Sequence, residues 1–478
     1  MMQAEELEEL NRDRTEHARV TALPSAPFGP RLVIQRYQLG NGLTVLLCED
    51  HSAKVVAYHT WYRVGSRHER PGKTGLAHLF EHLMFNETEQ LAKGEFDRRL
   101  MQAGAESNAS TWLDWTHYTI AVPSDQLGLV VGLEAERMAH LVLRAPELAS
   151  EKEVVLNERR FRVDDDVDGR LNEALWGAAL TRHPYRSPTI GSAEDIQGFT
   201  VEDCEAFYRA YYAPNNACVV VVGDARPLDL LRLVSDAYGA LTPSTISPED
   251  TWPEPPQLEA RELTLTLPTP TLKLALAYHA PAMGDADHPA LALLSEILTG
   301  GRASRLTHRL ITQGELASDV RSFLGPLKDP SLFEIAITAR EGVASAPILA
   351  IVSEELARLQ AELVSQAELD RALARFELGL VSGLESVEGK ASTIGLYEIV
   401  LGQPGAAFER LAAMRRVTPS DLRWAARRYL GAHQRTLIEV VPDESLLGEA
   451  PDEPASSEGA ASSEPGERAR DAAAREAS

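Results

Sequence analysis

The sequence repeats itself once, and the repeat sets the architecture. A strand-like run around the Ala-Tyr-His triplet at residues 57–59 returns around the same triplet at 277–279. A helix-like stretch that opens at residues 200–203 returns at 418–421, in both cases followed by an apolar run. Two matches in the same order indicate a duplicated domain of about 200 residues, within the usual range of domain sizes.

Both copies of the helix-like stretch carry the same start signal. Thr200 is followed three residues later by Asp203, and Thr418 by Asp421. A threonine and an acidic residue at this spacing can satisfy the free amide groups of a first helical turn. Strand-like and helix-like stretches alternate along the chain, which predicts an α+β fold of two homologous α/β-sandwich domains, each an antiparallel-rich sheet covered by helices.

Composition shifts give the expected boundaries. Proline-rich, acidic sequence that cannot hold a helix or a central strand predicts a linker. After about Pro442, the sequence contains almost no large apolar side chains. We expect a flexible N-terminus over 1–30, an N-terminal domain over 31–240, a linker over 241–263, a homologous C-terminal domain over 264–442 and a disordered acidic tail over 443–478.

Charge and cysteine content exclude several classes of function. The formal net charge of -24 disfavours nucleic acid and anionic membranes as partners, because both are bound through clustered Lys and Arg. No apolar run is long enough to cross a bilayer. Three scattered cysteines, Cys48, Cys204 and Cys218, favour a reducing compartment, and Met1 to His17 lack the pattern of a secretory signal. We therefore expect a cytoplasmic protein.

The chemistry is concentrated in the motif His-Leu-Phe-Glu-His at residues 78–82. His78 and His82 are four residues apart on a predicted helix, so both imidazoles can bind one ion. Glu81 lies close enough to accept a proton from a water held by the same ion. Zinc suits two neutral imidazoles and a carboxylate, and a catalytic zinc keeps one position open for water.

A third ligand is expected on a second helix that contains residues 151–158. Glu158 is our candidate. Glu151, two turns earlier on the same face, can hydrogen bond to a ligand histidine and fix its orientation. The predicted cofactor is one Zn²⁺ per chain, held by His78, His82 and Glu158.

The five-residue motif alone is also compatible with an ordinary helix that carries two satisfied histidines. The second copy argues against that alternative. There, Leu293 stands opposite His78 and Ile297 opposite His82, while Glu296 is retained opposite Glu81. Since the duplicate fills both histidine positions with aliphatic residues, the fold does not need histidine there for packing, which favours a ligand role in the first copy.

Together with residues 104–111 and the helix at 151–158, the motif resembles the pitrilysin or insulinase family of zinc metallopeptidases, the inverzincins. The resemblance covers nearly the whole ordered chain and is closest to bacterial members related to mitochondrial processing peptidase. It implies that the N-terminal domain is the zinc-binding peptidase domain, that the C-terminal domain lacks zinc ligands, and that Glu81 activates water.

The resemblance also implies a place for the substrate. In the family, the segment that matches Asn108 and Ala109 forms a sheet edge to which the substrate adds as a strand. From the residues alone, a plain turn into a strand is an equally good interpretation.

One departure from the family concerns the second half. Active members complete the site with an arginine and a tyrosine, but residues 304–318 contain no arginine after Leu310, and Ser318 stands where the tyrosine is expected. By similarity to two-chain relatives, we expect a heterodimer with a homologous subunit that lacks the zinc motif and supplies both residues, or a homodimer.

These observations predict a zinc-dependent endopeptidase that hydrolyses peptides or unfolded small proteins in a chamber between two homologous domains. The alternative from another class is a non-catalytic structural or assembly subunit of a peptidase-like complex.

Overall fold

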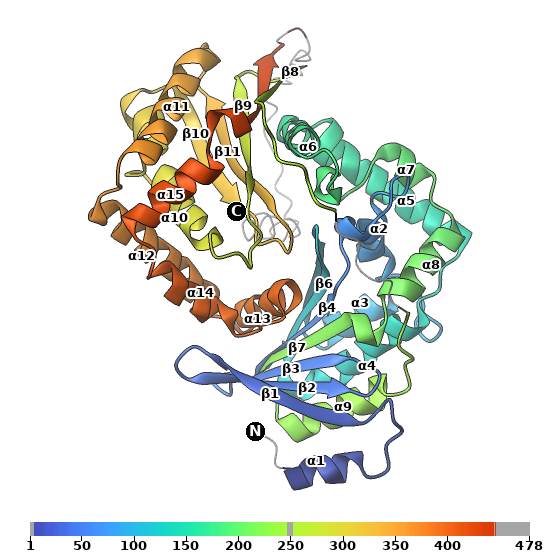
Figure 1. The fold of residues 1–478 in the computed structure, drawn as a ribbon. Helices are drawn as coiled ribbons and strands as arrows, with labels where there is room; N and C mark the ends of the chain where they lie inside the picture. Colours follow the sequence, from blue (N-terminus) through green and yellow to red (C-terminus); the bar gives the residue numbers. More distant parts are fainter. Residues whose placement is uncertain (1–3, 246–251, 444, 446–478) are drawn as a thin grey trace, which may run out of the picture.

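The structure is a computed structural model that describes residues 4–245, 252–443 and 445. The described residues form two halves, each containing one β-sheet and a layer of helices (Figure 1). Both sheets are mixed but mostly antiparallel, which confirms the predicted fold class.

The first sheet has seven strands in the order β1-β2-β3-β7-β4-β6-β5, and its β3/β7 pair is parallel. Valine and other apolar residues fill the central strand β7, all of whose residues are buried. The strands are β1 (Val20–Phe28), β2 (Leu32–Leu39), β3 (Thr44–Glu49), β4 (Val55–Tyr62), β5 (Glu106–Thr111), β6 (Thr116–Pro123) and β7 (Ala217–Gly223).

The second sheet has five strands in the order β10-β11-β9-β12-β8, and its β12/β8 pair is parallel. Read from β8, this order repeats that of β3-β7-β4-β6-β5 in the first sheet, so the internal duplication extends to strand order and direction. The strands are β8 (Arg261–Leu267), β9 (Lys273–Ala280), β10 (Ala317–Leu324), β11 (Ser331–Ala339) and β12 (Thr436–Pro442).

Each half contributes its own set of helices. In the first half they are α1 (Ala4–Asn11), α2 (Leu76–Leu83), α3 (Glu95–Gln102), α4 (Leu127–His140), α5 (Ala145–Arg159), the π-helical turn η3 (Arg160–Asp164), α6 (Val167–Ala179), α7 (Ala193–Gln197), α8 (Val201–Tyr211) and α9 (Pro227–Tyr238). In the second half they are α10 (His288–Thr299), the π-helical turn η6 (Thr307–Gln313), α11 (Ser345–Ala361), α12 (Gln366–Gly383), α13 (Val387–Leu401), α14 (Ala406–Met414) and α15 (Pro419–Tyr429).

The two predicted helix starts are confirmed. In α8 the Thr200 hydroxyl accepts a hydrogen bond from the Asp203 amide, and the Asp203 carboxylate accepts one from the Thr200 amide. Thr418 and Asp421 make the same reciprocal pair at the start of α15. Each pair satisfies two amide groups that have no partner within the helix.

The two halves exchange equivalent helices. Helix α6 of the first half packs on β8, β9 and β12 of the second sheet, while α13 of the second half packs on β4 and β7 of the first (Figure 1). The α13 contact is close, because a Cβ atom added to Gly395 would lie 2.1 Å from Nε1 of the Trp61 indole. This exchange buries the inner face of each sheet under a helix from the other half.

Polar contacts also join the halves. Asp329, in the connection between β10 and β11, accepts hydrogen bonds from Arg67 Nε at 2.8 Å and pairs with His183 Nε2 at 3.0 Å. Tyr185 donates to Asp114 at 2.6 Å, and the second oxygen of Asp114 accepts from the amide of Lys328 at 2.8 Å. These contacts give the loop that carries His183 and Tyr185 a structural role.

The predicted flexible N-terminus differs from the structure. Residues 4–11 form α1, and residues 20–28 form β1, which pairs with β2 through most of its length. Two prolines, Pro24 and Pro27, weaken the strand signal of this stretch, and the structure accommodates them because β1 lies at a sheet edge, where most of its side chains are exposed.

The predicted linker and tail lie partly outside the described residues. Of the linker, residues 241–245 and 252–260 contain no helix or strand, but β8 begins at Arg261, inside the predicted range. Parallel pairing with β12 explains this early start, since the pairing depends on a partner far along the chain. Of the tail, only Asp443 and Ser445 are described. No helix among the described residues is long and apolar enough to span a membrane.

Candidate metal centre

The site is built on helix α2, whose start is fixed by its neighbours. Gly75 precedes the helix with φ 95°, and a Cβ atom there would lie 2.5 Å from the carbonyl oxygen of Ile190. The carboxylate of Glu69 accepts hydrogen bonds from the amides of Gly75 and Ala77, each at 2.8 Å. Burial raises the pKa of the Glu69 carboxyl group to about 8, so its role here is to accept the two amide hydrogen bonds.

One side of α2 is anchored in the core. Leu76, Leu79, Phe80 and Leu83 are buried, and the Tyr118 hydroxyl of β6 donates to the Phe80 carbonyl at 3.0 Å. These contacts leave the face that carries both histidines directed toward α5. A helix anchored on one face holds the side chains of the other face in a defined position.

The three predicted ligands come together. Nε2 of His78 lies 3.6 Å and Nε2 of His82 lies 3.2 Å from the same oxygen, Oε2 of Glu158. Among the described residues, this is the one group of three or more His, Cys, Asp or Glu side chains whose ligand atoms all lie within 4.8 Å of one another. The structure thus joins α2 and the end of α5 at the point that the sequence indicated.

The second oxygen of Glu158 has a separate partner. Arg162, one turn later in η3, lies with Nη1 3.1 Å from Oε1 of Glu158. The two carboxylate oxygens of Glu158 therefore have different partners: Oε2 faces the histidines, and Oε1 pairs with the Arg162 guanidinium. The sequence analysis missed Arg162, although its spacing of four residues from Glu158 is the spacing of helical neighbours.

The protonation states of His78 and Glu158 suit metal binding. Burial lowers the pKa of His78, which favours its neutral form. For Glu158, burial acts to raise the pKa, but the hydrogen bond with His82 and the charges of His78 and Arg162 outweigh it and lower the pKa to about 2. Burial would lower the pKa of His82, yet its contact with Glu158 raises it. An ionised carboxylate and a neutral imidazole are the forms that bind a metal.

The donor set fits zinc. Ligands at zinc distances of about 2.0 to 2.2 Å in a tetrahedron lie about 3.3 Å apart, close to the 3.2 and 3.6 Å found between Glu158 and the two imidazoles. Three protein donors leave the fourth position of a tetrahedral zinc free for water or substrate.

Glu81 and Glu151 lie beside this group. The described residues offer the half-buried Glu81 carboxylate no hydrogen bond or ion pair, so it is free to act on a substrate. Glu151, expected to hydrogen bond to a ligand histidine, instead pairs with Lys93, its Oε1 lying 3.2 Å from Nζ. Nδ1 of His78 is buried and has no hydrogen-bond partner among the described residues. The expected contact is therefore not made, because the Lys93 ammonium neutralises Glu151 instead.

Asn108 and Ala109 lie on β5, the terminal strand of the first sheet, which packs beside α2. They pair with Thr119 and Tyr118 of β6. On its other side, β5 pairs with no described strand. The open edge of a sheet presents unpaired backbone groups, which is what strand addition by a peptide requires.

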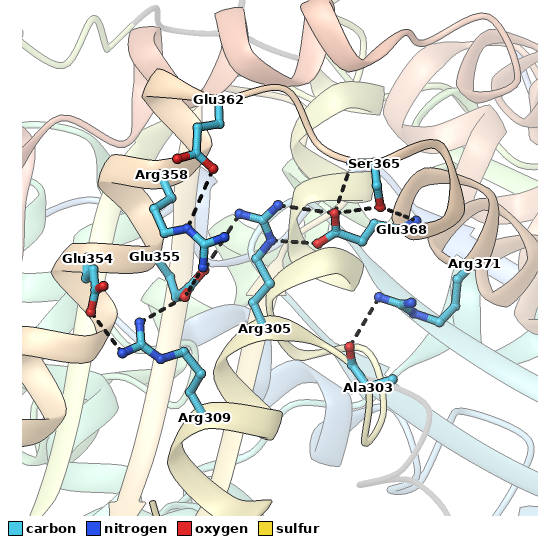
Figure 2. A network of polar contacts seen from close by, with 10 residues as sticks. All are labelled: Ala303, Arg305, Arg309, Glu354, Glu355, Arg358, Glu362, Ser365, Glu368 and Arg371. Atoms are coloured by element: carbon cyan, nitrogen blue, oxygen red, sulfur yellow. Dashed lines mark hydrogen bonds and ion pairs between the residues drawn. The ribbon is translucent and has the colours of Figure 1, made fainter. Parts of the chain in front are cut away.

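The second half contributes no arginine or tyrosine at the family positions. Ser318 lies exposed on β10 and donates to the Thr338 carbonyl at 3.3 Å. Arg305 is engaged elsewhere: its Nε donates to Glu368 at 2.7 Å, and its Nη1 lies 3.6 Å from Glu355 (Figure 2).

The network around Glu355 is structural. The Glu355 carboxylate is 1% exposed and is also contacted by Arg309 at 2.9 Å and Arg358 at 3.0 Å (Figure 2). It joins η6, α11 and α12, the helices that cover the face of the second sheet opposite α6. Arg305 and Arg309 therefore stabilise the outer helical layer.

Comparison with known proteins agrees with this geometry. Residues 44–193 match the model described as "Insulinase (Peptidase family M16)", and residues 198–376 match the one described as "Peptidase M16 inactive domain". The zinc protease PqqE of Helicobacter pylori is 33% identical over 84% of this chain and 92% of its own length.

Two solved structures are also similar. A crystal structure of a protease from Helicobacter pylori matches with a TM-score of 0.82 and 32% identity, covering 86% of this chain and 99% of that one. The periplasmic protease PqqL of Escherichia coli matches with a TM-score of 0.72 over 91% of this chain and 50% of that chain, and at 20% identity it shows the fold alone. The chain belongs to the insulinase family of peptidases, peptidase family M16. Its relatives within that family are zinc proteases, which supports a protease-like function and a zinc cofactor.

Proposed function

We propose that the chain is a zinc-dependent endopeptidase that acts on peptides or unfolded small proteins between its two halves. The observation that carries the proposal is the convergence of His78, His82 and Glu158 on one point, 3.2 to 3.6 Å apart. His78, His82 and Glu158 would hold one zinc ion. When bound, zinc would polarise the substrate carbonyl and lower the pKa of the attacking water.

Glu81 is the general base and acid. Its carboxylate takes a proton from the attacking water and returns it to the nitrogen of the leaving amine, so the residue ends the cycle in its initial state. Its position on α2, one residue before His82, puts this carboxylate beside the ligand group. A peptide added along Asn108 and Ala109 of β5 would pass next to α2 and present its backbone carbonyl there.

The heterodimer predicted above is retained as part of the proposal. Ser318 cannot stabilise an oxyanion as a tyrosine hydroxyl would, and Arg305 is held by Glu368 and Glu355. A homologous subunit without the zinc motif would supply the arginine and the tyrosine. A homodimer could not, because each copy has the same second half.

The test combines metal analysis with a quenched-peptide assay on the chain alone and co-expressed with a homologous partner. We expect one zinc per chain in both samples and hydrolysis only with the partner. Glu81→Gln should retain zinc and lose activity by a factor of about 10² or more, and a chelator should abolish activity until zinc is restored. Full activity of Glu81→Gln would contradict the assigned role, and equal activity of the single chain would contradict the need for a partner.

A non-catalytic assembly subunit is the second candidate. The serine at position 318 and the match of residues 198–376 to a domain described as inactive favour it. If the chain binds zinc stoichiometrically but hydrolyses no peptide, alone or in any partner combination, the non-catalytic assembly subunit becomes the favoured function.

We further propose a cytoplasmic location. The three cysteines are buried and unpaired, as expected in a reducing compartment. Cell fractionation with a periplasmic marker tests this location, and recovery of the chain with that marker would overturn it.

A further inference from the structure

A cavity of about 640 Å³ lies between the two halves, beside the candidate metal centre. One wall is α6 and η3, which directly follow the ligand Glu158, and the other is formed by β9, β10 and β11 of the second sheet. Arg162, which pairs with Glu158, lines both the metal centre and the cavity. The cavity therefore adjoins the candidate metal centre.

Small residues on the second sheet create the space. Ala275 of β9 and Ala336 of β11 are paired neighbours on the face that α6 covers, and both line the cavity. Larger side chains at these positions would fill the gap beneath α6. Four aromatic side chains form part of the remaining walls: the ring centroids of Trp112 and Phe323 lie 6.2 Å apart, and those of Trp176 and Tyr185 lie 6.4 Å apart.

Five charged side chains line this cavity, and four of them have ionic partners. Arg162 pairs with Glu158 and Glu173 with Arg159, each at 3.1 Å, Asp168 pairs with Lys273 at 2.8 Å, and Arg321 lies 3.7 Å from Asp319. Glu334 of β11 has no ion pair within 4.0 Å among the described residues. Its neighbours are the Trp176 indole and, at longer range, Arg321, whose side chain is 64% exposed.

We propose that this cavity is a specificity subsite for a lysine or arginine side chain of the substrate, with Glu334 as the acceptor of its cationic group. The inference rests on the proposed peptidase function. Aromatic rings attract a cation through their faces, and they also cover the apolar stem of lysine or arginine. The Glu334 carboxyl group is contacted by the Trp176 indole and, among the described residues, has no cation within ion-pair distance. Burial raises the pKa of Glu334 to about 8, as expected for a carboxyl group without a close cation.

The experiment uses the zinc-loaded chain, with its partner subunit if activity requires one, at pH 8.5. A set of quenched peptides carries one lysine moved through each position around the cleaved bond, and a matched set carries norleucine, which has a similar stem without charge. For one position, we expect kcat/KM to be about tenfold or more higher with lysine than with norleucine. Glu334→Gln should remove most of that ratio, and because the ratio compares two peptide sets in the same variant, a change common to both sets cancels.

Two further variants separate a specific effect from a general one. Glu341→Gln makes the same change at an exposed position after β11, outside the cavity, and should keep the wild-type ratio. Ala336→Leu fills the cavity and should weaken cleavage with lysine or norleucine at that position, while an alanine peptide is cleaved normally. An unchanged lysine ratio in Glu334→Gln, or no lysine preference in the wild type, overturns the subsite.

A binding measurement keeps the subsite distinct from the peptidase function. The same peptides, labelled at one end, are titrated by fluorescence anisotropy into the Glu81→Gln chain, in which hydrolysis is not required. Lysine-dependent binding that is lost with Glu334→Gln supports the subsite even if no peptide is ever cleaved. Binding without any lysine preference overturns the subsite even if peptides are hydrolysed.

Discussion

Arg162 holds Oε1 of Glu158 at 3.1 Å, while Oε2 of the same carboxylate faces the two histidines. The guanidinium thus fixes the rotation of the third ligand and leaves one oxygen for the metal. Groups that orient metal ligands typically contribute a factor of about 10 to 100 in metal affinity.

We therefore expect Arg162→Gln to weaken zinc binding by about 10-fold or more, measured by competition with a fluorescent zinc chelator. Arg160→Gln is the matched control, because Arg160 lies on the same turn but contacts Asn157 and is exposed. Equal zinc affinity in wild type and Arg162→Gln would show that Glu158 is positioned by α5 alone.

Glu69 should determine how well α2 forms. Its carboxyl group accepts hydrogen bonds from two amide groups at the helix start, so Glu69→Ala removes both hydrogen bonds. We expect a loss of about 1 to 2 kcal/mol in the free energy of unfolding and weaker zinc binding, measured by urea denaturation and chelator competition. Glu69→Gln keeps one acceptor oxygen and should lose less. A larger loss in Glu69→Gln than in Glu69→Ala would contradict the capping role.

Replacing one partner of the buried ion pair between Arg137 and Glu134 should strongly destabilise the fold. Arg137 and Glu134 are each 1% exposed and lie 2.5 Å apart, and the guanidinium lies 4.1 Å from the ring centroid of Tyr118. Arg137→Met would leave Glu134 buried and unpaired, for an expected loss of about 3 to 5 kcal/mol in the free energy of unfolding. The double variant Arg137→Met with Glu134→Gln should recover part of this loss, as measured by urea denaturation. No recovery would mean that packing against the aromatic rings is the larger contribution.

Glu334 should make stability depend on pH. Its pKa is raised by burial to about 8 in the folded state, against about 4.3 in an unfolded chain. The native state binds this proton more tightly, so its contribution to the free energy of unfolding is fully present below about pH 4.3, falls as the pH rises to about 8 and is then constant.

Glu334→Gln removes this titration. We expect the difference in melting temperature, Glu334→Gln minus wild type, to increase by a few degrees as the pH is raised from 5 to 8. Differential scanning fluorimetry in matched buffers measures this difference. Glu341→Gln should show no such trend. A constant difference between Glu334→Gln and wild type across this range would mean that Glu334 titrates normally.

Much of the fold followed from local signals in the sequence. The repeated Ala-Tyr-His triplets lie on the equivalent strands β4 and β9, and Thr200 and Thr418 begin equivalent helices. The spacing of His78 and His82 also indicated a shared site, because helical periodicity alone puts residues four apart on one face. Glu158 was chosen as the third ligand from its helix and from the family resemblance.

Other features were invisible in the sequence because they depend on contacts between distant segments. The strand β1 contains two prolines and lies at a sheet edge, where its backbone is ordered by pairing with β2. Lys93, rather than a histidine, is the partner of Glu151, and Asp329 meets Arg67 and His183 from the other half of the chain. Periodicity and spacing carry no information about which surface groups meet when two domains pack.

The sequence by itself determined the duplicated α/β architecture, the helix that carries His78, Glu81 and His82, and the chemical type of the site, because each of these depends on residues close together in the chain. Only the tertiary structure decided that Glu158 Oε2 lies within 3.6 Å of both imidazoles and that α6 and α13 are exchanged between the halves. It also decided that Glu334 lines a cavity in which no described residue forms an ion pair with it. Those outcomes depend on how two sheets and their helices pack, and packing is set by the summed fit of many side chains rather than by any local pattern.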